Sequence, residues 1–255
     1  MSHVNTGPPP LSRRLLAEGV GTALLVAVVV GSGIAAQQLS PSDVGLQLLE
    51  NSTATVFGLG VLILIFGPVS GAHFNPVVSA VDWLLGRRSG TGLPGRHVAA
   101  YTLVQIIGAI LGAILANVMF DHAVVSISTH HRVTTGHGVS EIVATAGLVT
   151  LIFVLARSGR AALSAAAVGV YIGAAYWFTS STSFANPAVT IGRIFSNTFA
   201  GIAPASAPLY IAAQIIGALL GLGLVLALFP DAGDTADQAV IPHPGSLPDP
   251  SPSTT

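Results

Sequence analysis

Two Asn-Pro pairs lie inside strongly apolar stretches of this sequence, in "SGAHFNPVVSAVDWLL" and in "SFANPAVTIGR". Asn75 and Pro76 form the first pair, and Asn186 and Pro187 form the second. Asn is a favoured N-cap, and Pro at the first helical position loses no hydrogen bond, so each pair predicts the start of a helix. The chemistry available there is hydrogen-bond donation to a polar group, from free backbone N–H groups and from the Asn amide.

The composition is that of a membrane protein. Hydrophobic residues make up 51% of the chain and charged residues only 7%, whereas soluble domains carry about 25% charged residues. A net charge of −1 does not suit a nucleic-acid partner, which would require a basic patch. The absence of cysteine from the sequence excludes disulfides and thiolate chemistry.

Six apolar runs are each about 20 residues long, the length that spans a bilayer as a helix. They are predicted at residues 14–36, 46–67, 97–119, 139–157, 162–180 and 208–229. With six spans, most arginines fall on one side of the membrane, namely Arg13, Arg14, Arg87, Arg88, Arg96, Arg157 and Arg160. The positive-inside rule makes that side cytoplasmic. We therefore expect a multi-pass protein of the cell membrane with both termini in the cytoplasm.

The two halves of the sequence resemble each other. "YTLVQIIGAILGAIL" matches "LYIAAQIIGALLGLGL", and "AEGVGTALLV" matches "SEIVATAGLV", which aligns Glu18 with Glu141. Each half holds three spans, so the second half must be inverted relative to the first, as in many channels and transporters. The sequence thus predicts a single domain over 13–230, with repeats at about 13–120 and 138–230. It lies between tails at 1–12 and 231–255 whose composition is typical of disorder.

The segments that follow the Asn-Pro pairs are each about ten apolar residues long, too short to cross a bilayer. Because the repeats are inverted, we expect two half-helices that enter from opposite faces and meet with their N-termini near the midplane. Non-helical backbone at that depth is tolerated only inside protein or along a water-filled cavity. The buried helix starts therefore predict a pore. The N-terminus of each half-helix would place a partial positive charge of about +0.5 at the centre of this pore.

The doubled Asn-Pro box, "SGAHFNP", one buried Glu in each half and the six inverted spans resemble the aquaporin (major intrinsic protein) family. The boxes here are Asn75-Pro76-Val77, with Val in place of the usual Ala, and Asn186-Pro187-Ala188. The resemblance implies an all-α fold of six transmembrane helices and two re-entrant half-helices. It also implies a homotetramer in the lipid bilayer that passively conducts water or small uncharged solutes. Glu18, Glu141 and His73 would then support the re-entrant loops.

The resemblance also locates a selectivity filter. Family members commonly have Arg directly after the second box, but Val189 stands there, and counting back from the boxes without gaps gives Ala174, Ser183 and Thr55. Four small uncharged residues predict a wide, weakly polar pore mouth. Arg193 lies four residues beyond Val189 on the same helical face, ~6 Å farther along. We expect it to pack at the surface or pair with a loop carboxylate; the alternative is that it points inward and restores the constriction.

A wide filter predicts a channel for glycerol, urea or metalloid hydroxides such as arsenous acid. The sequences that flank the two boxes resemble a bacterial branch of the family that has Val in place of the filter Arg. Members of this branch are associated with arsenic-resistance gene clusters. Three alternatives remain open. One is a water-selective channel closed by Arg193, another is an ion-coupled transporter that uses Glu18 and Glu141, and the third is a structural membrane protein with a closed pore. The sequence has no nucleophile–base set, so we predict neither an enzyme nor a cofactor.

Four histidines accompany Arg132 between the third and fourth spans, at His122, His130, His131 and His137. Histidine titrates near neutral pH and binds metals, but this spacing fits no tetrahedral zinc site. We therefore predict a solvated loop and no metal site.

Overall fold

The computed structural model describes residues 9–87 and 89–230, and every regular element in these ranges is helical. The α-helices are α1 (Leu11–Leu39), α2 (Val44–Ser70), α3 (Pro76–Gly86), α4 (Gly95–Met119), α5 (Thr135–Arg157), α6 (Ser164–Phe178), α7 (Pro187–Gly192) and α8 (Ala207–Leu228). Three short 3-10 helices accompany them: η1 (Ala161–Leu163), η2 (Arg193–Phe195) and η3 (Pro204–Ser206).

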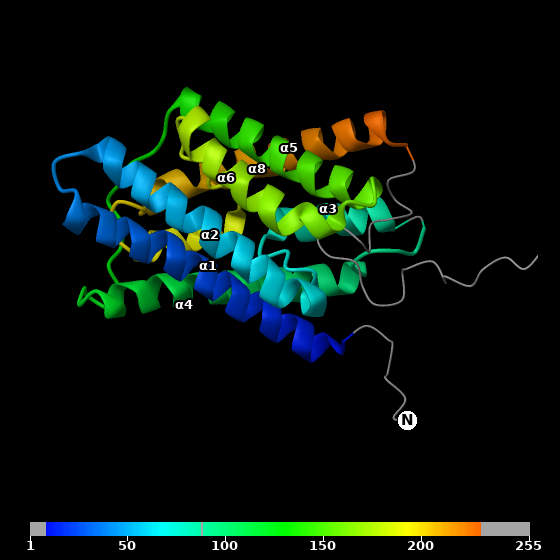
Figure 1. Cartoon of the computed structure of the whole chain (residues 1–255), viewed down its shortest axis with the longest axis horizontal. Coiled ribbons are helices and arrows are strands. Elements are labelled where there is room, and N and C mark those ends of the chain that lie inside the picture. The colour runs from blue at the N-terminus through cyan, green and yellow to red at the C-terminus, as the bar shows by residue number, and fades with distance from the viewer. Residues whose placement is uncertain (1–8, 88, 231–255) are drawn as a thin grey trace, which may run out of the picture.

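Six helices are long and apolar enough to cross a membrane, which confirms the six predicted spans. They are α1, α2, α4, α5, α6 extended by η1, and α8 extended by η3, and they run side by side along the long axis of the molecule (Figure 1). The two ends of the described chain lie at the same end of this bundle (Figure 1). The tail predicted at 231–255 lies outside the described residues. The tail predicted at 1–12 overlaps α1, because the helix already begins at Leu11.

The packing of the long helices repeats between the two halves. The most extensive contacts are those of α1 with α4 and of α5 with α8. A Cβ added to Gly112 would lie 2.1 Å from the Ala23 carbonyl oxygen, and one added to Gly221 would lie 2.7 Å from the Ala146 carbonyl oxygen. These contacts occupy equivalent places in the two repeats. Small residues thus bring the helix backbones close together, as is common between membrane helices.

The two short helices begin at the predicted prolines. α3 has 11 residues, as expected, and α7 has six before it tightens into η2, which continues the helical segment to Phe195. Neighbouring segments take the carbonyls that would continue it: Ser128 donates its N–H to the Ile194 carbonyl, and Ile202 donates to the Arg193 carbonyl. The chain around α7 is therefore tied to the connection between α4 and α5.

Replacing Gly112 with Ala should destabilise the protein by about 1–3 kcal/mol, because the new Cβ meets backbone rather than a side chain that can move. Thermal unfolding of the detergent-solubilised protein would measure the loss. Gly223→Ala is the matched control, since a Cβ there has nothing within 4 Å. Equal unfolding temperatures for the two variants would contradict the close helix contact.

Candidate functional site

The two half-helices are capped by the asparagines that precede them. The Asn75 Oδ1 accepts a hydrogen bond from the Val77 N–H at 3.1 Å. The Asn186 Oδ1 accepts from the N–H groups of Ala188 and Val189 at 2.9 and 3.2 Å. Both asparagines have extended backbone and stand directly before a helical proline. The N-caps predicted from the sequence are therefore confirmed.

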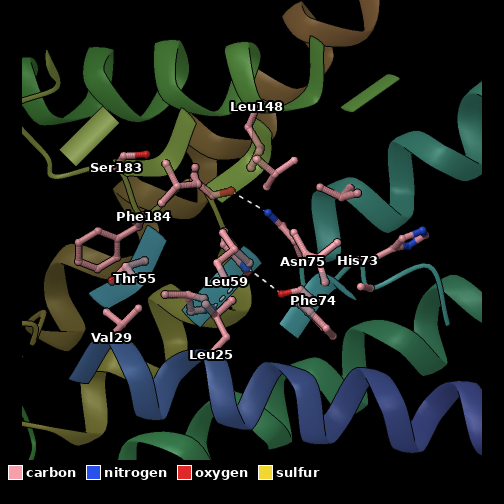
Figure 2. Close-up of a pocket in the computed structure, with 18 of the residues that line it drawn as sticks. Leu25, Val29, Thr55, Leu59, His73, Phe74, Asn75, Leu148, Ser183 and Phe184 are labelled. Carbon is pink, nitrogen blue, oxygen red and sulfur yellow. Dashed lines mark hydrogen bonds between the residues drawn. The ribbon is translucent and has the colours of Figure 1, made fainter. Parts of the chain in front are cut away.

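The same two amides join the halves of the molecule. The Asn75 Nδ2 donates to the Ala185 carbonyl at 2.8 Å, and the Asn186 Nδ2 donates to the Phe74 carbonyl at 2.7 Å. These crossed bonds are the two dashed lines in Figure 2. An amide nitrogen carries two N–H groups, so each asparagine uses one for this bond and keeps a second.

Glu18 and Glu141 hold the segments that lead into the half-helices. Both are completely buried. The carboxylate of Glu18 accepts hydrogen bonds of 2.7 to 2.9 Å from Ser70 Oγ, His73 N, Phe74 N and Gln105 Nε2. That of Glu141 accepts bonds of 2.6 to 2.9 Å from Ser181 Oγ, Phe184 N, Ala185 N and Gln214 Nε2. Each carboxylate thus organises one re-entrant loop, in the position expected of a loop-supporting residue.

The backbone of these loops is strained in an equivalent way in the two halves. Ala72 and Phe74 have φ values of 48° and 49°, and Ser183 and Ala185 have φ values of 49° and 48°. A left-handed conformation costs a residue with a side chain about 1–2 kcal/mol. The Glu carboxylates bind the N–H groups of Phe74 and Ala185, and the crossed amides bind their carbonyls. These hydrogen bonds offset the strain.

His73 belongs to the same framework. Its Nδ1 hydrogen-bonds Ser79 Oγ at 3.0 Å, and its ring packs edge-on against Tyr101 at 5.6 Å between centroids. Its backbone N–H is one of the donors to Glu18. The side chain also borders the cavity described next.

Asn75 and Asn186 both line a narrow cavity of about 70 Å³. A volume of this size holds a few water molecules. Its walls are mainly apolar, with Leu25, Val29, Leu59 and Leu148 drawn around it in Figure 2. The polar side chains on its border are Thr55, His73, Asn75, Tyr176, Ser183, Asn186 and Arg193. Both halves of the chain therefore contribute to one cavity with a few hydrogen-bonding groups among apolar walls.

Three of the four predicted filter residues border this cavity, namely Thr55, Ser183 and Val189. The placement of Ala174 was wrong, because it lies on the exposed outer side of α6. Tyr176 borders the cavity instead. Ala174 and Tyr176 are two residues apart, which corresponds to about 200° of rotation around a helix. The position obtained by counting back from Asn186 therefore lies on the opposite face of α6 from the cavity.

Arg193 is buried, with 2% of its surface exposed, and it borders the cavity. Its Nε donates a hydrogen bond to the Ala200 carbonyl, and its guanidinium carbon lies 3.4 Å from the centre of the Phe184 ring. The expectation that Arg193 packs at the surface or pairs with a carboxylate was therefore wrong. A carbonyl and an aromatic face compensate the buried cation. The sequence did not single out Phe184, and its only signal was an aromatic residue two positions before the second box.

Arg132 reaches the same aromatic ring from the connection between α4 and α5. Its guanidinium carbon lies 5.6 Å from the Phe184 ring centre, and its side chain donates to the carbonyls of Gly201 and Phe199. The connection is thus anchored and not simply solvated, which corrects the prediction for this side chain. Partial burial and the charge of Arg132 lower the pKa of the neighbouring His130. Within residues 9–87 and 89–230, no group of three His, Cys, Asp or Glu residues could hold a metal ion.

A sequence profile described as "Major intrinsic protein" matches residues 7–183 and 160–247. The chain belongs to the major intrinsic protein family. Among relatives of this family member, aquaglyceroporin AqpS of Rhizobium meliloti (strain 1021) is 49% identical over 215 residues, which cover 84% of this chain and 89% of AqpS. Aquaporin-2 of Homo sapiens is 29% identical over 249 residues, with 90% and 84% of the two chains covered. These relatives span nearly the whole described bundle.

The fold of this major intrinsic protein also matches a solved structure. The X-ray structure of the aquaglyceroporin from Plasmodium falciparum superposes with a TM-score of 0.61, covering 88% of this chain and 99% of the other. Their sequence identity is 17%, so this match supports the shared fold of six long helices and two half-helices.

Replacing Glu141 with Gln should cost at least about 2 kcal/mol of stability, because hydrogen bonds to a charged acceptor are lost. In addition, the new amide N–H₂ would face donors. Unfolding of the solubilised protein, followed by heating or denaturant, measures this loss. Glu50→Gln is the control, since its Oε1 accepts one hydrogen bond, from Ser40. A Glu141→Gln variant as stable as Glu50→Gln would show that the carboxylate does not hold the loop.

Proposed function

We propose that this major intrinsic protein is a passive membrane channel for water and small uncharged solutes. The observation that carries the proposal is the narrow cavity between the crossed Asn75 and Asn186 amides. A solute passing there can exchange its hydrogen bonds with water for bonds with the free amide N–H groups. An ion cannot recover its hydration energy from a few neutral donors among apolar walls. The channel acts without a cofactor.

The same reasoning supports solutes larger than water. The side chain at the position directly after the second box is Val189, which offers no charge and no hydrogen bond to the cavity. Thr55 and Ser183 add hydroxyl groups beside it. We propose glycerol, urea and undissociated metalloid hydroxides such as arsenous acid as the solute class. The name of the relative AqpS, an aquaglyceroporin, is consistent with this proposal.

A second candidate is a water-selective channel in which Arg193 restores the constriction. One observation favours it: the Arg193 guanidinium borders the cavity and is held there by Ala200 and Phe184. Val189 and Arg193 therefore make opposing contributions to the size and charge of the outer part of the cavity.

The hydrogen bonding of the two buried carboxylates argues against an ion-coupled transporter. Such a transporter needs groups near the midplane that bind the coupling ion. Glu18 and Glu141 each accept four hydrogen bonds, three from the segment that leads into a half-helix and one from a glutamine of a long helix, Gln105 of α4 or Gln214 of α8. Binding an ion there would break the bonds that maintain the strained backbone.

We place the end of the bundle that carries both chain ends in the cytoplasm of the cell, since it also carries most arginines, and we propose a homotetramer. Protease protection of a tagged terminus in sealed vesicles tests the orientation, and cross-linking in the membrane tests the assembly.

The solute class can be tested by stopped-flow light scattering on proteoliposomes under an inward glycerol or arsenous acid gradient. We expect rapid re-swelling for the native protein. We expect slow re-swelling for Val189→Arg, because the guanidinium fills the space beside Ser183 and Thr55. Water flow under an impermeant osmolyte serves as the control for protein density. Equal solute flux in the two proteins would contradict the role of Val189.

The same assay separates the two candidates through Arg193→Ala. If Arg193 limits the cavity, glycerol flux should rise relative to water flux in this variant. An unchanged flux ratio would leave Arg193 without a role in selection. Arg160→Ala, at the opposite end of the bundle, controls for the general effect of removing an arginine.

A further inference from the structure

Cationic and titratable side chains gather where α1 and α4 begin. The two helices pack along each other, and both start at the same end of the bundle (Figure 1). The first turn of α1 carries Arg13 and Arg14, and the first turn of α4 carries Arg96 and His97. Residues far apart in the sequence thus form one basic cluster at this end of the bundle.

The adjoining sequence does not neutralise this charge. Neither helix has an acidic residue in its first turn, and the sequence has no Asp or Glu in residues 1–17 or 83–120. The positive end of the helix dipole makes a cation at a helix start unfavourable. An anion bound beside the cluster would relieve this repulsion.

The arginines of the cluster keep hydrogen-bond donors free for such an anion. Arg13 and Arg96 are exposed. Arg96 donates its Nε N–H to His97 Nε2 at 3.4 Å, and Arg14 donates its Nε N–H to the Tyr101 hydroxyl at 2.8 Å. In the described part of the chain, the terminal guanidinium nitrogens of these arginines donate no hydrogen bond. A guanidinium can bind two phosphate oxygens through parallel N–H groups.

An apolar surface adjoins the basic cluster on the outside of the bundle. A row of exposed apolar side chains with four residues between neighbours begins at Leu16 on α1, and another begins at Leu103 on α4. Residues four apart lie on one face of a helix. The rows end at Leu24 and Leu115, which border the same open groove. The two rows therefore flank one side of the contact between α1 and α4.

Trp83 marks the level of the membrane surface beside the cluster. A Cβ added to Gly95 would lie 2.7 Å from the Trp83 Nε1, so the indole packs against the start of α4, and 36% of it is exposed. Tryptophan is enriched at the boundary between membrane and water. The basic cluster thus lies at the level of the lipid headgroups, and the apolar rows lie at the level of the acyl chains.

We propose that the starts of α1 and α4 bind an anionic phospholipid of the adjoining leaflet. Its phosphate lies against the exposed Arg13 and Arg96, while Arg14 and His97 add to the attraction. Its acyl chains lie along the two apolar rows. The charge of the cluster favours an anionic over a zwitterionic headgroup, and the apolar rows favour a lipid over a free phosphate ion, which makes no contact with them.

Quenching of Trp83 fluorescence by brominated lipids tests the proposal in the full chain. The sequence contains two tryptophans, so Trp177→Phe leaves Trp83 as the single fluorophore. The protein is reconstituted in phosphatidylcholine vesicles that contain a small mole fraction of phosphatidylglycerol with brominated acyl chains. Quenching beyond that by brominated phosphatidylcholine at the same mole fraction measures the preference of the site for the anionic lipid.

We expect phosphatidylglycerol to bind at least about tenfold more tightly than phosphatidylcholine. This preference should fall about three- to tenfold in Arg96→Gln, because one arginine near a lipid surface contributes that much. Arg13→Gln should have the same effect, and it keeps the proposal testable if Arg96→Gln fails to fold. Arg160→Gln is the matched control, since this exposed arginine lies on the connection between α5 and η1, and it should keep the native preference.

Equal quenching by the two brominated lipids would overturn the proposal. An equal loss of preference in Arg160→Gln would also overturn it, because the attraction would then belong to the whole charged surface and not to this cluster. The third arm adds millimolar inorganic phosphate at constant ionic strength. Loss of quenching there would assign the cluster to a soluble anion and reject the lipid.

Discussion

The structure depends on the need to hydrogen-bond two stretches of non-helical backbone within the membrane. The hydrocarbon core of the bilayer offers no hydrogen-bond partners to the backbone N–H and C=O groups of these stretches. Each such group left without a hydrogen bond costs several kcal/mol. Glu18 and Glu141 bind the N–H groups, and the Asn75 and Asn186 amides bind carbonyls of the opposite half. Because both asparagines also cap their helices, the same atoms fix the loops, the helix starts and the contact between the halves.

The cavity is defined by the polar groups that this framework does not consume. The buried carboxylates are occupied by hydrogen bonds from the re-entrant segments and from Gln105 and Gln214, and they do not border the cavity. What remains are the second amide N–H groups, the hydroxyls of Tyr176 and Ser183, and the guanidinium of Arg193. The amides and hydroxyls among these groups are uncharged, and Arg193 adds one positive charge. The Phe184 ring links the cavity to the segment between α4 and α5, because Arg193 from the cavity wall and Arg132 from that segment both lie against it.

The sequence predicted the parts of the molecule that depend on local signals. The Asn-Pro pairs give the helix starts, the apolar runs give the spans, and the repeated Glu18 and Glu141 mark the loop supports. It failed where the result depends on helix phase or on contacts distant in sequence. The position of Ala174 was wrong because a two-residue shift turns the helix face, and that shift places Tyr176 at the cavity. The burial of Arg193 depends on Phe184 and the Ala200 carbonyl, a combination that no local pattern shows.

The bond between Asn75 and Ala185 joins residues 110 positions apart in the chain. At the usual pace of protein synthesis, the ribosome needs on the order of ten seconds to make that length. During this time the newly made first repeat has no Ala185 carbonyl to receive the Asn75 amide, and the Phe74 carbonyl has no Asn186 to bind. The first re-entrant segment therefore cannot reach its final depth with all bonds formed until the second repeat enters the bilayer. The hydrogen bonding of the first re-entrant segment is therefore completed only by the second repeat, although each repeat has its own three spans.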